Sequence, residues 1–492
     1  MLDMLIAIVP KMNPDAPTVG PAVLKSHLID AGFTCEVVDF NVKLFSELKK
    51  KGKENYYFKD DYVFATRVDG KPDTYPKVHP DFTALVDEFE YVFLDWIEYI
   101  KQKNPRFLGL SLLSYFSVSV SMKISELVRE HLPHVKIVWG GGGLEYGIWK
   151  FKEMNLMDHY INGDGENSIV ELLKGNLSYS GIDKWEPNQV RDLDSVLLPN
   201  YDDINWDEYH HVDWENIVYI TGSRGCVKRC TFCNVYEMWP DYLFRSGKSI
   251  AKEIIHVKEK YNRYTFKFTD SLINGSMKAF RDLLTELIEY RKINTDFTWQ
   301  SQWIIRSKSL IPENDMKHYA LIKESGCNWL EIGLESFSQH VRFHMGKKVT
   351  DTDVWWCLEM LNKFKIPHIL LMIVGYPTET EEDHQNTLKS VKKIFELGWD
   401  KYTHFSFGNT LMVEKPQPLY KLIEDGLEYH NSSIDWKYKD NDLDTRVRRF
   451  NEVNNLIKEL KNVKELNWLN EKALINYNKK IKGELESSKW NG

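Results

Sequence analysis

The sequence contains few cysteines, no strongly basic segment and no long hydrophobic run. Six cysteines in 492 residues are too few for a disulfide scaffold and indicate a reducing compartment, so we expect a cytoplasmic protein. The formal net charge of −8 provides no basic patch for nucleic acid. The most apolar window, Phe107–Val120, is interrupted by serines and is too short to span a bilayer. The stretch Met1–Pro10 carries Asp3 and is too short in apolar residues for a signal peptide.

The chain does contain enough apolar material for several cores. Hydrophobic residues make up 42% of it and aromatic residues 13%, and its length favours three domains. Alternating strand and helix patterns predict the α/β class. We expect a doubly wound, Rossmann-like domain over residues 1–175, a linker over 176–215, an incomplete barrel over 216–410 and a mainly helical region over 411–492.

Short apolar runs predict the strands of the first domain. One of them is nearly continuous in apolar residues, as buried parallel strands are. These strands are expected at residues 4–9, 34–40, 107–113, 135–139 and 159–162. Between them the pattern predicts helices that begin at Pro21 and Asn167 and cover 82–101 and 118–132, with 56–80 as a loop insertion.

Two glycine-rich loops follow the last two of these strands. The first is Gly140-Gly141-Gly142-Gly143, and the second is Gly163-Asp164-Gly165-Glu166. Such loops allow the backbone to approach another group closely. They also serve tight turns between strand and helix, so by themselves they do not distinguish a ligand site from a structural turn.

Three cysteines stand close together in the central part of the chain. Cys226, Cys230 and Cys233 follow a C-x3-C-x2-C spacing. Three such thiolates can hold three corners of a cubane iron–sulfur cluster, and an iron without a protein ligand can bind a small molecule. The alternative is a structural zinc site, which needs four ligands. The nearest other cysteine, Cys327, is far along the chain, and His210 and His211 lie upstream. We expect Cys327 and Cys357 to be core residues.

Six strand–helix repeats are predicted over residues 216–410. Right-handed crossovers would curl such strands into a barrel, where chemistry is located at the carboxyl ends of the strands. The cysteine loop, Asp270, Glu335 and the turn Gly375–Pro377 all follow predicted strands. This agreement between motif and position favours a common site.

The cysteine motif, with Phe232 directly before the last cysteine, resembles the radical S-adenosylmethionine (SAM) superfamily. In that superfamily the open iron of a 4Fe-4S cluster binds SAM, and reductive cleavage gives a 5′-deoxyadenosyl radical. The resemblance implies SAM contacts at Phe232, Asp270, Glu335, Arg306, Gly375 and Pro377. Two of them have a structural alternative: Asp270 is also suited to cap a helix, and Arg306 to form a surface salt bridge.

The first domain resembles the cobalamin-binding domain that precedes many radical SAM domains. The resemblance is carried by Leu108–Leu113, Ile137–Gly143 with Leu144-Glu145, and Asp158–Glu166, and it implies cobalamin contacts at Gly140, Gly141, Gly142, Gly163, Gly165 and Glu166. The D-x-H-x-x-G motif that supplies a histidine ligand to cobalt is absent. Its absence fits radical SAM members that hold cobalamin without histidine, and it also fits a domain without cofactor.

The resemblance implies a radical SAM enzyme that performs cobalamin-dependent C-methylation, with an electron donor such as flavodoxin or ferredoxin and a small-molecule or peptide substrate. A rearrangement or cyclisation without methyl transfer is a second interpretation. A non-catalytic protein that binds cobalamin or metal is a third. A second cluster is not expected, because there is no second cysteine trio.

Overall fold

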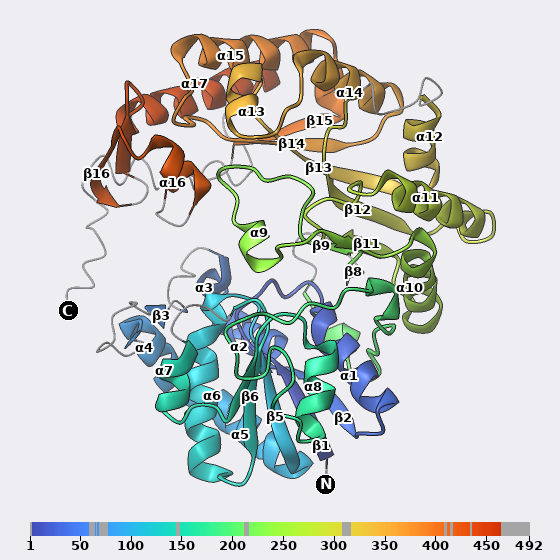
Figure 1. Ribbon diagram of the computed structural model, residues 1–492, viewed down its shortest axis with the longest axis vertical. Coiled ribbons are helices and arrows are strands. Elements are labelled where there is room, and N and C mark those ends of the chain that lie inside the picture. Colours follow the sequence, from blue (N-terminus) through green and yellow to red (C-terminus); the bar gives the residue numbers. More distant parts are fainter. Residues whose placement is uncertain are drawn as a thin grey trace. The chain divides into compact units, whose positions relative to one another are not determined.

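The computed structural model describes residues 2–58, 64, 66–67, 77–143, 148–210, 216–307, 316–407, 411–413, 417–432 and 435–463 (Figure 1). The chain divides into two compact units. The first comprises Met1–Thr221 and Ser249–Lys267, and the second comprises Gly222–Lys248 and Phe268–Gly492. Among the described residues, no helix combines the length and the apolar character needed to cross a membrane.

The first unit contains a parallel sheet of five strands in the order β2-β1-β5-β6-β7. Its strands are β1 (Leu2–Ile8), β2 (Cys35–Asp39), β5 (Pro105–Ser111), β6 (Lys136–Gly140) and β7 (His159–Ile161). Alternate residues of β1 enter two different cores, with Leu5 and Ala7 on one face and Met4 and Ile6 on the other. Both faces of the sheet are therefore covered, as the doubly wound class requires.

Helices cover this sheet on both faces and follow its strands in chain order. They are α1 (Val19–Asp30), α2 (Phe40–Lys50), α3 (Asn55–Phe58), α4 (Pro80–Glu88), α5 (Glu90–Lys103), α6 (Val118–His131), α7 (Ile148–Glu153) and α8 (Gly165–Leu173). The single helix expected over 82–101 is two helices that meet at Phe89, which is fully buried. Within the expected loop over 56–80, β3 (Thr66–Arg67) pairs with β4 (Lys77–Val78), and most of the residues between them lie outside the described part.

The second sheet has six strands in the order β15-β14-β13-β12-β11-β8, so strands that follow one another in the chain are neighbours in space. They are β8 (Ile217–Ile220), β11 (Thr265–Phe268), β12 (Thr298–Trp303), β13 (Cys327–Glu335), β14 (His368–Met372) and β15 (Thr403–Ser406). The pairs from β12 to β15 are parallel. This sequential order confirms the expected α/β class with repeated strand–helix units.

Helices connect these strands. They are α10 (Gly247–Tyr261), α11 (Met277–Arg291), α12 (Met316–Glu324), α13 (Gln339–His344), α14 (Asp351–Lys363) and α15 (Glu381–Glu396), with the short α9 (Val235–Met238) after the cysteine loop. A capping box begins α15, in which Thr380 and Asp383 exchange hydrogen bonds with each other's backbone N–H. Part of the stretch after Pro377 therefore serves to start a helix.

The C-terminal part is less helical than expected. Helices α16 (Pro418–Ile423) and α17 (Leu443–Lys461) flank an antiparallel hairpin of β16 (Leu427–Ser432) and β17 (Asp435–Tyr438). The hairpin buries Trp436, which packs with Leu419 and Val413. Residues 464–492, with Trp468 and Trp490, lie outside the described part, as do His211 and Leu144-Glu145.

Candidate functional site

The cysteine loop begins directly after β8 and closes on itself. Its first residues form β9 (Ser223–Arg224), which pairs antiparallel with β10 (Leu243–Phe244). Gly225 has a positive φ of 81°, and a Cβ there would lie 2.4 Å from the carbonyl oxygen of Asp241. Only glycine fits this turn without displacing the backbone. The loop therefore leaves the sheet at a fixed point just before the first cysteine.

The three cysteines lie within this closed loop. Cys230 is buried, whereas Cys226 and Cys233 are half-buried. The backbone N–H of Lys228 donates to Sγ of Cys226 over 3.4 Å, and the N–H of Cys233 donates to the carbonyl of Cys230 over 3.1 Å. Burial raises the pKa of the thiols of Cys226 and Cys230, and the nearby ammonium of Lys347 opposes this shift. A bound metal ion would deprotonate such thiols outright.

A segment after α13 holds the cysteine loop from another side. The backbone N–H of Thr231 donates to the carbonyl of Met345 over 3.1 Å. The side chain of Lys228 donates to the carbonyl of Lys347 over 3.0 Å. Gly346, with a φ of 80°, lies between these two acceptors and would place a Cβ 3.1 Å from the carbonyl oxygen of Arg229. The loop is thus held on both sides of Cys230, by the side chain of Lys228 and by the backbone N–H of Thr231.

Phe232 contributes an apolar contact to the same loop. Its ring packs against a cluster that includes Met345, Tyr376 and Trp436. The Nζ atom of Lys347 lies 5.9 Å from the centre of the Phe232 ring. The aromatic residue therefore joins the cysteine loop to the core of the second unit, and its predicted SAM contact stays a prediction.

Asp270 lies at the base of the loop. It is buried, and its carboxylate accepts hydrogen bonds from the backbone N–H of Gly222 over 2.8 Å and from Oγ of Ser223 over 2.5 Å. Burial raises the pKa of Asp270 to about 7, against these hydrogen bonds. The alternative role as a helix cap is wrong, because Ser276 caps α11. Asp270 holds the entry to the cysteine loop, and its predicted SAM contact stays a prediction.

We expect the replacement Asp270→Asn to change how stability depends on pH. The pKa of Asp270 is higher in the folded chain than its ordinary value, so the stability that this carboxyl confers is greatest at low pH and is lost as pH rises through about 7. The thermal midpoint of the native protein minus that of the variant should fall between about pH 5 and pH 7 and level off above about pH 8. Calorimetry without oxygen would measure this; a difference that rises with pH would contradict it.

Glu335 ends β13 and faces a lysine. It has a positive φ of 67°, and its side chain is only 13% exposed. Nζ of Lys347 lies 3.2 Å from Oε1 of Glu335 and donates to the carbonyl of Gly333 over 2.7 Å. Burial raises the pKa of Glu335, and the charge of Lys347 opposes this. A strained backbone that carries a buried charge pair is a common property of functional sites.

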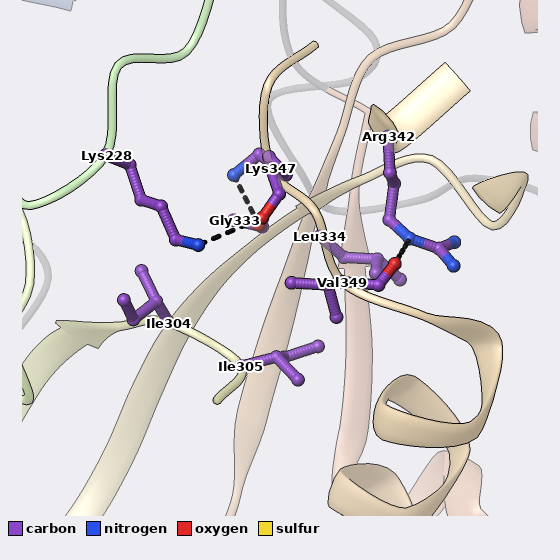
Figure 2. Close-up of a pocket in the computed structure, with 8 residues that line it drawn as sticks. All are labelled: Lys228, Ile304, Ile305, Gly333, Leu334, Arg342, Lys347 and Val349. Carbon is purple, nitrogen blue, oxygen red and sulfur yellow. Dashed lines mark hydrogen bonds between the residues drawn. The ribbon is translucent and has the colours of Figure 1, made fainter. Parts of the chain in front are cut away.

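These residues belong to a pocket next to the cysteine loop (Figure 2). Lys228 reaches it from the loop, Gly333 and Leu334 come from β13, and Ile304 and Ile305 follow β12. Its full lining is Lys228, Ile304, Ile305, Gly333, Leu334, Arg342, Lys347 and Val349. The pocket thus combines two ammonium groups with apolar walls at the carboxyl ends of β12 and β13.

Among the described residues, Arg306 contacts backbone carbonyls and forms no salt bridge. Its Nε and one terminal nitrogen donate to the carbonyl of Asn274 over 3.2 and 2.6 Å, and the same nitrogen donates to the carbonyl of Gly275. The guanidinium therefore holds the loop between β11 and α11. Its predicted pairing with a carboxylate of SAM stays a prediction.

The turn after β14 also meets the cysteine loop. Gly375, Tyr376 and Pro377 are all buried in it. Oη of Tyr376 and Oγ1 of Thr231 are 2.8 Å apart, and Thr231 lies between Cys230 and Phe232. The structure thus brings the cysteine loop and this turn together, as the barrel prediction implies.

Two glycines of the first unit, Gly141 and Gly163, have a structural reason within the chain. A Cβ at Gly141, with φ of 110°, would lie 2.3 Å from the carbonyl oxygen of Leu112, and one at Gly163, with φ of 83°, would lie 2.2 Å from that of Asn188. A Cβ at Gly140 or Gly142 would meet nothing closer than 3.3 Å. Gly141 and Gly163 are therefore required by the protein's own backbone.

The second glycine-rich loop begins α8. A Cβ at Gly165 would lie 3.2 Å from the side chain of Leu24, and Glu166 is only 5% exposed in the first turn of the helix. Asp164 accepts a hydrogen bond from the backbone N–H of Val190 over 2.7 Å. This loop is tied to the following segment of the chain, and its predicted cobalamin contacts stay predictions.

An apolar edge in the first unit was missed by the sequence analysis. Leu113 is 52% exposed and Tyr115 is 39% exposed, and both follow β5. In the order β2-β1-β5-β6-β7 the chain adds β2 on one side of β1 and then β5, β6 and β7 on the other side. Ligands of such sheets bind at the carboxyl ends of the strands at this switch point, which lies between β1 and β5. In the sequence, the signal for this edge is that apolar residues continue beyond the end of the strand into its connection with the next helix. Lys347 carried no such signal.

Residues 220–391 match the model described as the radical SAM superfamily. An uncharacterized methyltransferase of Pyrococcus horikoshii is 24% identical over 334 residues, which are 64% of this chain and 70% of that protein.

Two solved structures share the fold over most of the chain. The radical S-adenosylmethionine methyltransferase TsrM from Kitasatospora setae, with tryptophan substrate and a SAM analog bound, is 16% identical with a TM-score of 0.58, covering 87% of this chain and 78% of that one. The cobalamin-dependent S-adenosylmethionine radical enzyme OxsB is 14% identical with a TM-score of 0.64, covering 98% of this chain and 71% of that one. At these identities the matches show a common fold.

Proposed function

Residues 220–391 belong to the radical SAM superfamily, and from this premise we propose that the protein cleaves SAM reductively at a 4Fe-4S cluster held by Cys226, Cys230 and Cys233. The observation that carries the proposal is the placement of these three cysteines on one loop after β8, next to the pocket that Lys228 and Lys347 line. Three thiols on one loop match three corners of such a cluster and leave one iron open.

The remaining cysteines support this assignment. Cys35, Cys327 and Cys357 are buried in the described part of the chain, and burial raises the pKa of each thiol. These three residues lie on β2, β13 and α14, outside the cysteine loop, and behave as core residues. The donor set therefore fits a cluster with three protein ligands better than a zinc site with four.

The chain's own residues would bind and orient SAM. When bound, the cluster supplies the electron that breaks the carbon–sulfur bond of SAM and gives methionine and a 5′-deoxyadenosyl radical. The ammonium of Lys347 and the carboxylate of Glu335 offer opposite charges for the polar groups of the methionine part. Ile304, Ile305 and Leu334 would exclude water from the pocket.

The experiment that tests this proposal is the formation of 5′-deoxyadenosine. Protein reconstituted with iron and sulfide without oxygen, and reduced with dithionite, is expected to convert SAM to 5′-deoxyadenosine and methionine. In the cell a low-potential donor such as flavodoxin or ferredoxin would supply the electron. Reduced protein that holds iron and leaves SAM intact in the absence and presence of candidate substrates would contradict the proposal.

We further propose that the first unit binds cobalamin and that the enzyme transfers a methyl group to carbon. The support is the doubly wound sheet, the exposed apolar edge of Leu113 and Tyr115, and the fold shared with TsrM and OxsB, whose names state radical SAM chemistry. When bound, methylcobalamin supplies the methyl group. The loops that follow β5, β6 and β7, with Gly140, Gly142 and Glu166, would surround the corrin ring.

The replacement Leu113→Asp is expected to lower cobalamin binding about tenfold. The leucine side chain is half exposed and would be covered by the corrin ring, whereas an aspartate would have to lose its hydration there. Leu94→Asp is the matched control, because Leu94 is 42% exposed on α5 and does not follow a strand. Cobalt content after purification from cells supplied with cobalamin is the measurement. Equal cobalt content in both variants would contradict the assignment of this edge, and absence of cobalt from the native protein would favour a cobalamin-free radical reaction.

A further inference from the structure

The turn after β14 is closed by its own glutamate. Gly375 has a φ of 78°, and its backbone N–H donates to Oε2 of Glu379 over 2.6 Å. The N–H of Glu379 in turn donates to the carbonyl of Tyr376 over 2.8 Å. Glu379 is only 5% exposed. Its carboxylate is therefore committed to holding the backbone of the turn.

Helix α17 supports this turn with two arginines on one face. Arg449 lies 3.3 Å from Oε2 of Glu379, donates to the carbonyl of Glu379 over 3.0 Å and is 4% exposed as a side chain. One turn earlier in the helix, Arg446 packs so closely that a Cβ at Gly375 would lie 2.3 Å from its Cγ. Arg446 is anchored by hydrogen bonds to the carbonyls of Trp436 and Asn441 over 2.8 and 3.3 Å.

The opposite side of the same turn contacts the cysteine loop. Oη of Tyr376 lies 2.8 Å from Oγ1 of Thr231 and 3.0 Å from Nδ1 of His344. The side-chain amide of Asn441 donates to the carbonyl of Tyr376 over 2.7 Å. A continuous set of contacts therefore runs from α17 through the turn to the residue that follows Cys230.

We propose that Glu379 and Arg449 are positioning residues, which set the Gly375–Pro377 turn so that helix α17 controls how tightly the adenosyl part of SAM binds beside the cysteine loop. This inference rests on the proposed cleavage of SAM. A buried ion pair is costly and contributes little net stability. Burial raises the pKa of Glu379 to about 7, because a carboxylate is less stable in the protein interior than in water. The charges that face Glu379 are Arg449 of α17 and Asp383 of α15.

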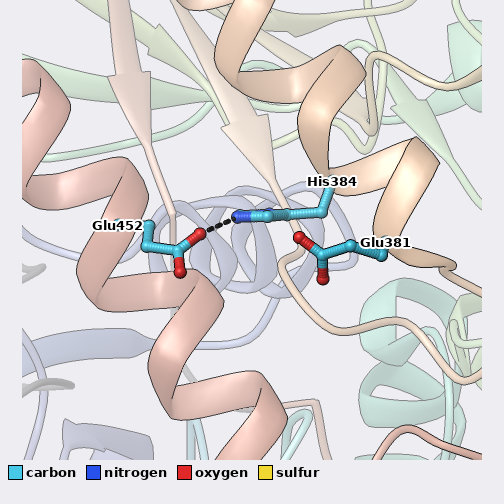
Figure 3. Close-up of side chains that lie close together, drawn as sticks. All are labelled: Glu381, His384 and Glu452. Carbon is cyan, nitrogen blue, oxygen red and sulfur yellow. Dashed lines mark hydrogen bonds and ion pairs between the residues drawn. The ribbon is translucent and has the colours of Figure 1, made fainter.

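A second group of charges lies between the same two helices and provides the controls. Figure 3 shows three of its members, Glu381, His384 and Glu452. Arg448 bridges Glu381 of α15 and Glu452 of α17 over 2.7 and 2.8 Å, and His384 lies 2.8 Å from Glu452. Arg448 already supplies the positive charge that these two carboxylates need, so the group is a contact between helices and does not require a metal ion. Arg448 and Glu452 are 47% and 37% exposed as side chains, and neither contacts the turn in the part of the chain that the structure describes. Glu381 is not used as a control, because its Oε2 also lies 3.5 Å from Nε of Arg449.

The test compares variants of the buried pair with variants of the exposed pair. Arg449→Lys keeps the charge but removes the guanidinium nitrogen that contacts both the carbonyl and the carboxylate of Glu379. A double variant, Glu379→Leu with Arg449→Met, removes both buried charges and leaves the N–H of Gly375 without its acceptor. Arg448→Lys and Glu452→Gln are the controls. The readouts are iron content, thermal midpoint, and KM and kcat for SAM in the formation of 5′-deoxyadenosine.

Both variants of the buried pair are expected to bind iron normally and to raise KM for SAM about tenfold, because a hydrogen bond that involves a charged group is lost. The controls should change KM by less than about twofold. If the pair serves only the packing of α17, the double variant will keep the native KM, and this result would overturn the inference. If the double variant does not fold, an unchanged KM in Arg449→Lys would overturn it. Native protein that forms no 5′-deoxyadenosine would instead overturn the proposed function itself.

Discussion

Replacing any one of Cys226, Cys230 and Cys233 by alanine is expected to lower iron content severalfold and to reduce the formation of 5′-deoxyadenosine by at least about a thousandfold. A cubane with only two protein ligands loses its cluster readily, and the chemistry belongs to the cofactor, so little activity remains without it. All three thiols lie in the loop that β9 and β10 close, and their removal leaves the contacts of Asp270 with this loop intact.

The matched controls are Cys35→Ala and Cys327→Ala. Cys35 belongs to β2 and Cys327 to β13, both are buried, and each replacement removes one sulfur from a core. They should cost some stability and leave iron content and SAM cleavage close to native. Iron content that falls equally in the loop variants and in the controls would show that the trio has no special role. Stoichiometric zinc in place of iron in the native protein would favour a structural zinc site.

The replacement Lys347→Met is expected to raise KM for SAM by about a hundredfold. Removing the ammonium leaves the buried carboxylate of Glu335 without its partner at 3.2 Å and frees the carbonyl of Gly333. The pocket then has one ammonium group instead of two, so the net charge around bound SAM becomes more negative. The backbone carbonyl of Lys347 still accepts from Lys228, so the cysteine loop keeps its support and iron content should stay near native.

Lys348→Met is the matched control for this variant. Lys348 is the next residue and is exposed, and its φ of 50° suits lysine and methionine equally. It should change KM for SAM by less than about twofold. The measurement is the dependence of 5′-deoxyadenosine formation on SAM concentration for both variants. An unchanged KM in Lys347→Met would show that the pocket in Figure 2 does not hold SAM.

The fold could be predicted where local pattern and global fold agree. The spacing of apolar residues predicts the buried strand over 107–113 and the strand–helix repeats of the second sheet. The break at Phe89 was missed because the apolar spacing continues across it, while burial of its ring decides where α4 ends. The hairpin of β16 and β17 was missed because its sequence is mostly polar and charged, and its stability comes from Trp436 packing in a distant core.

The site could be predicted only in part. The cysteine spacing is local, so the sequence was sufficient to find the loop. The hydrogen-bond partners of Asp270 and Lys347 are distant in the sequence, and no local sequence pattern predicts them. The glycine-rich loops illustrate a different limit. Gly141 must lack a side chain because the carbonyl of Leu112 is close, and the same requirement would arise if a ligand were close. Sequence alone cannot distinguish these two neighbours.

The most direct single measurement is the electron paramagnetic resonance spectrum of the reduced, iron-reconstituted native protein before and after addition of SAM. The cysteine trio on the loop after β8 leaves one iron without a protein ligand in the proposed cluster. The spectrum of a reduced cluster should therefore appear and then change when SAM binds to that iron. A spectrum of a fully ligated cluster that SAM leaves unaltered would contradict the proposed function, even if the protein contains iron in full amount.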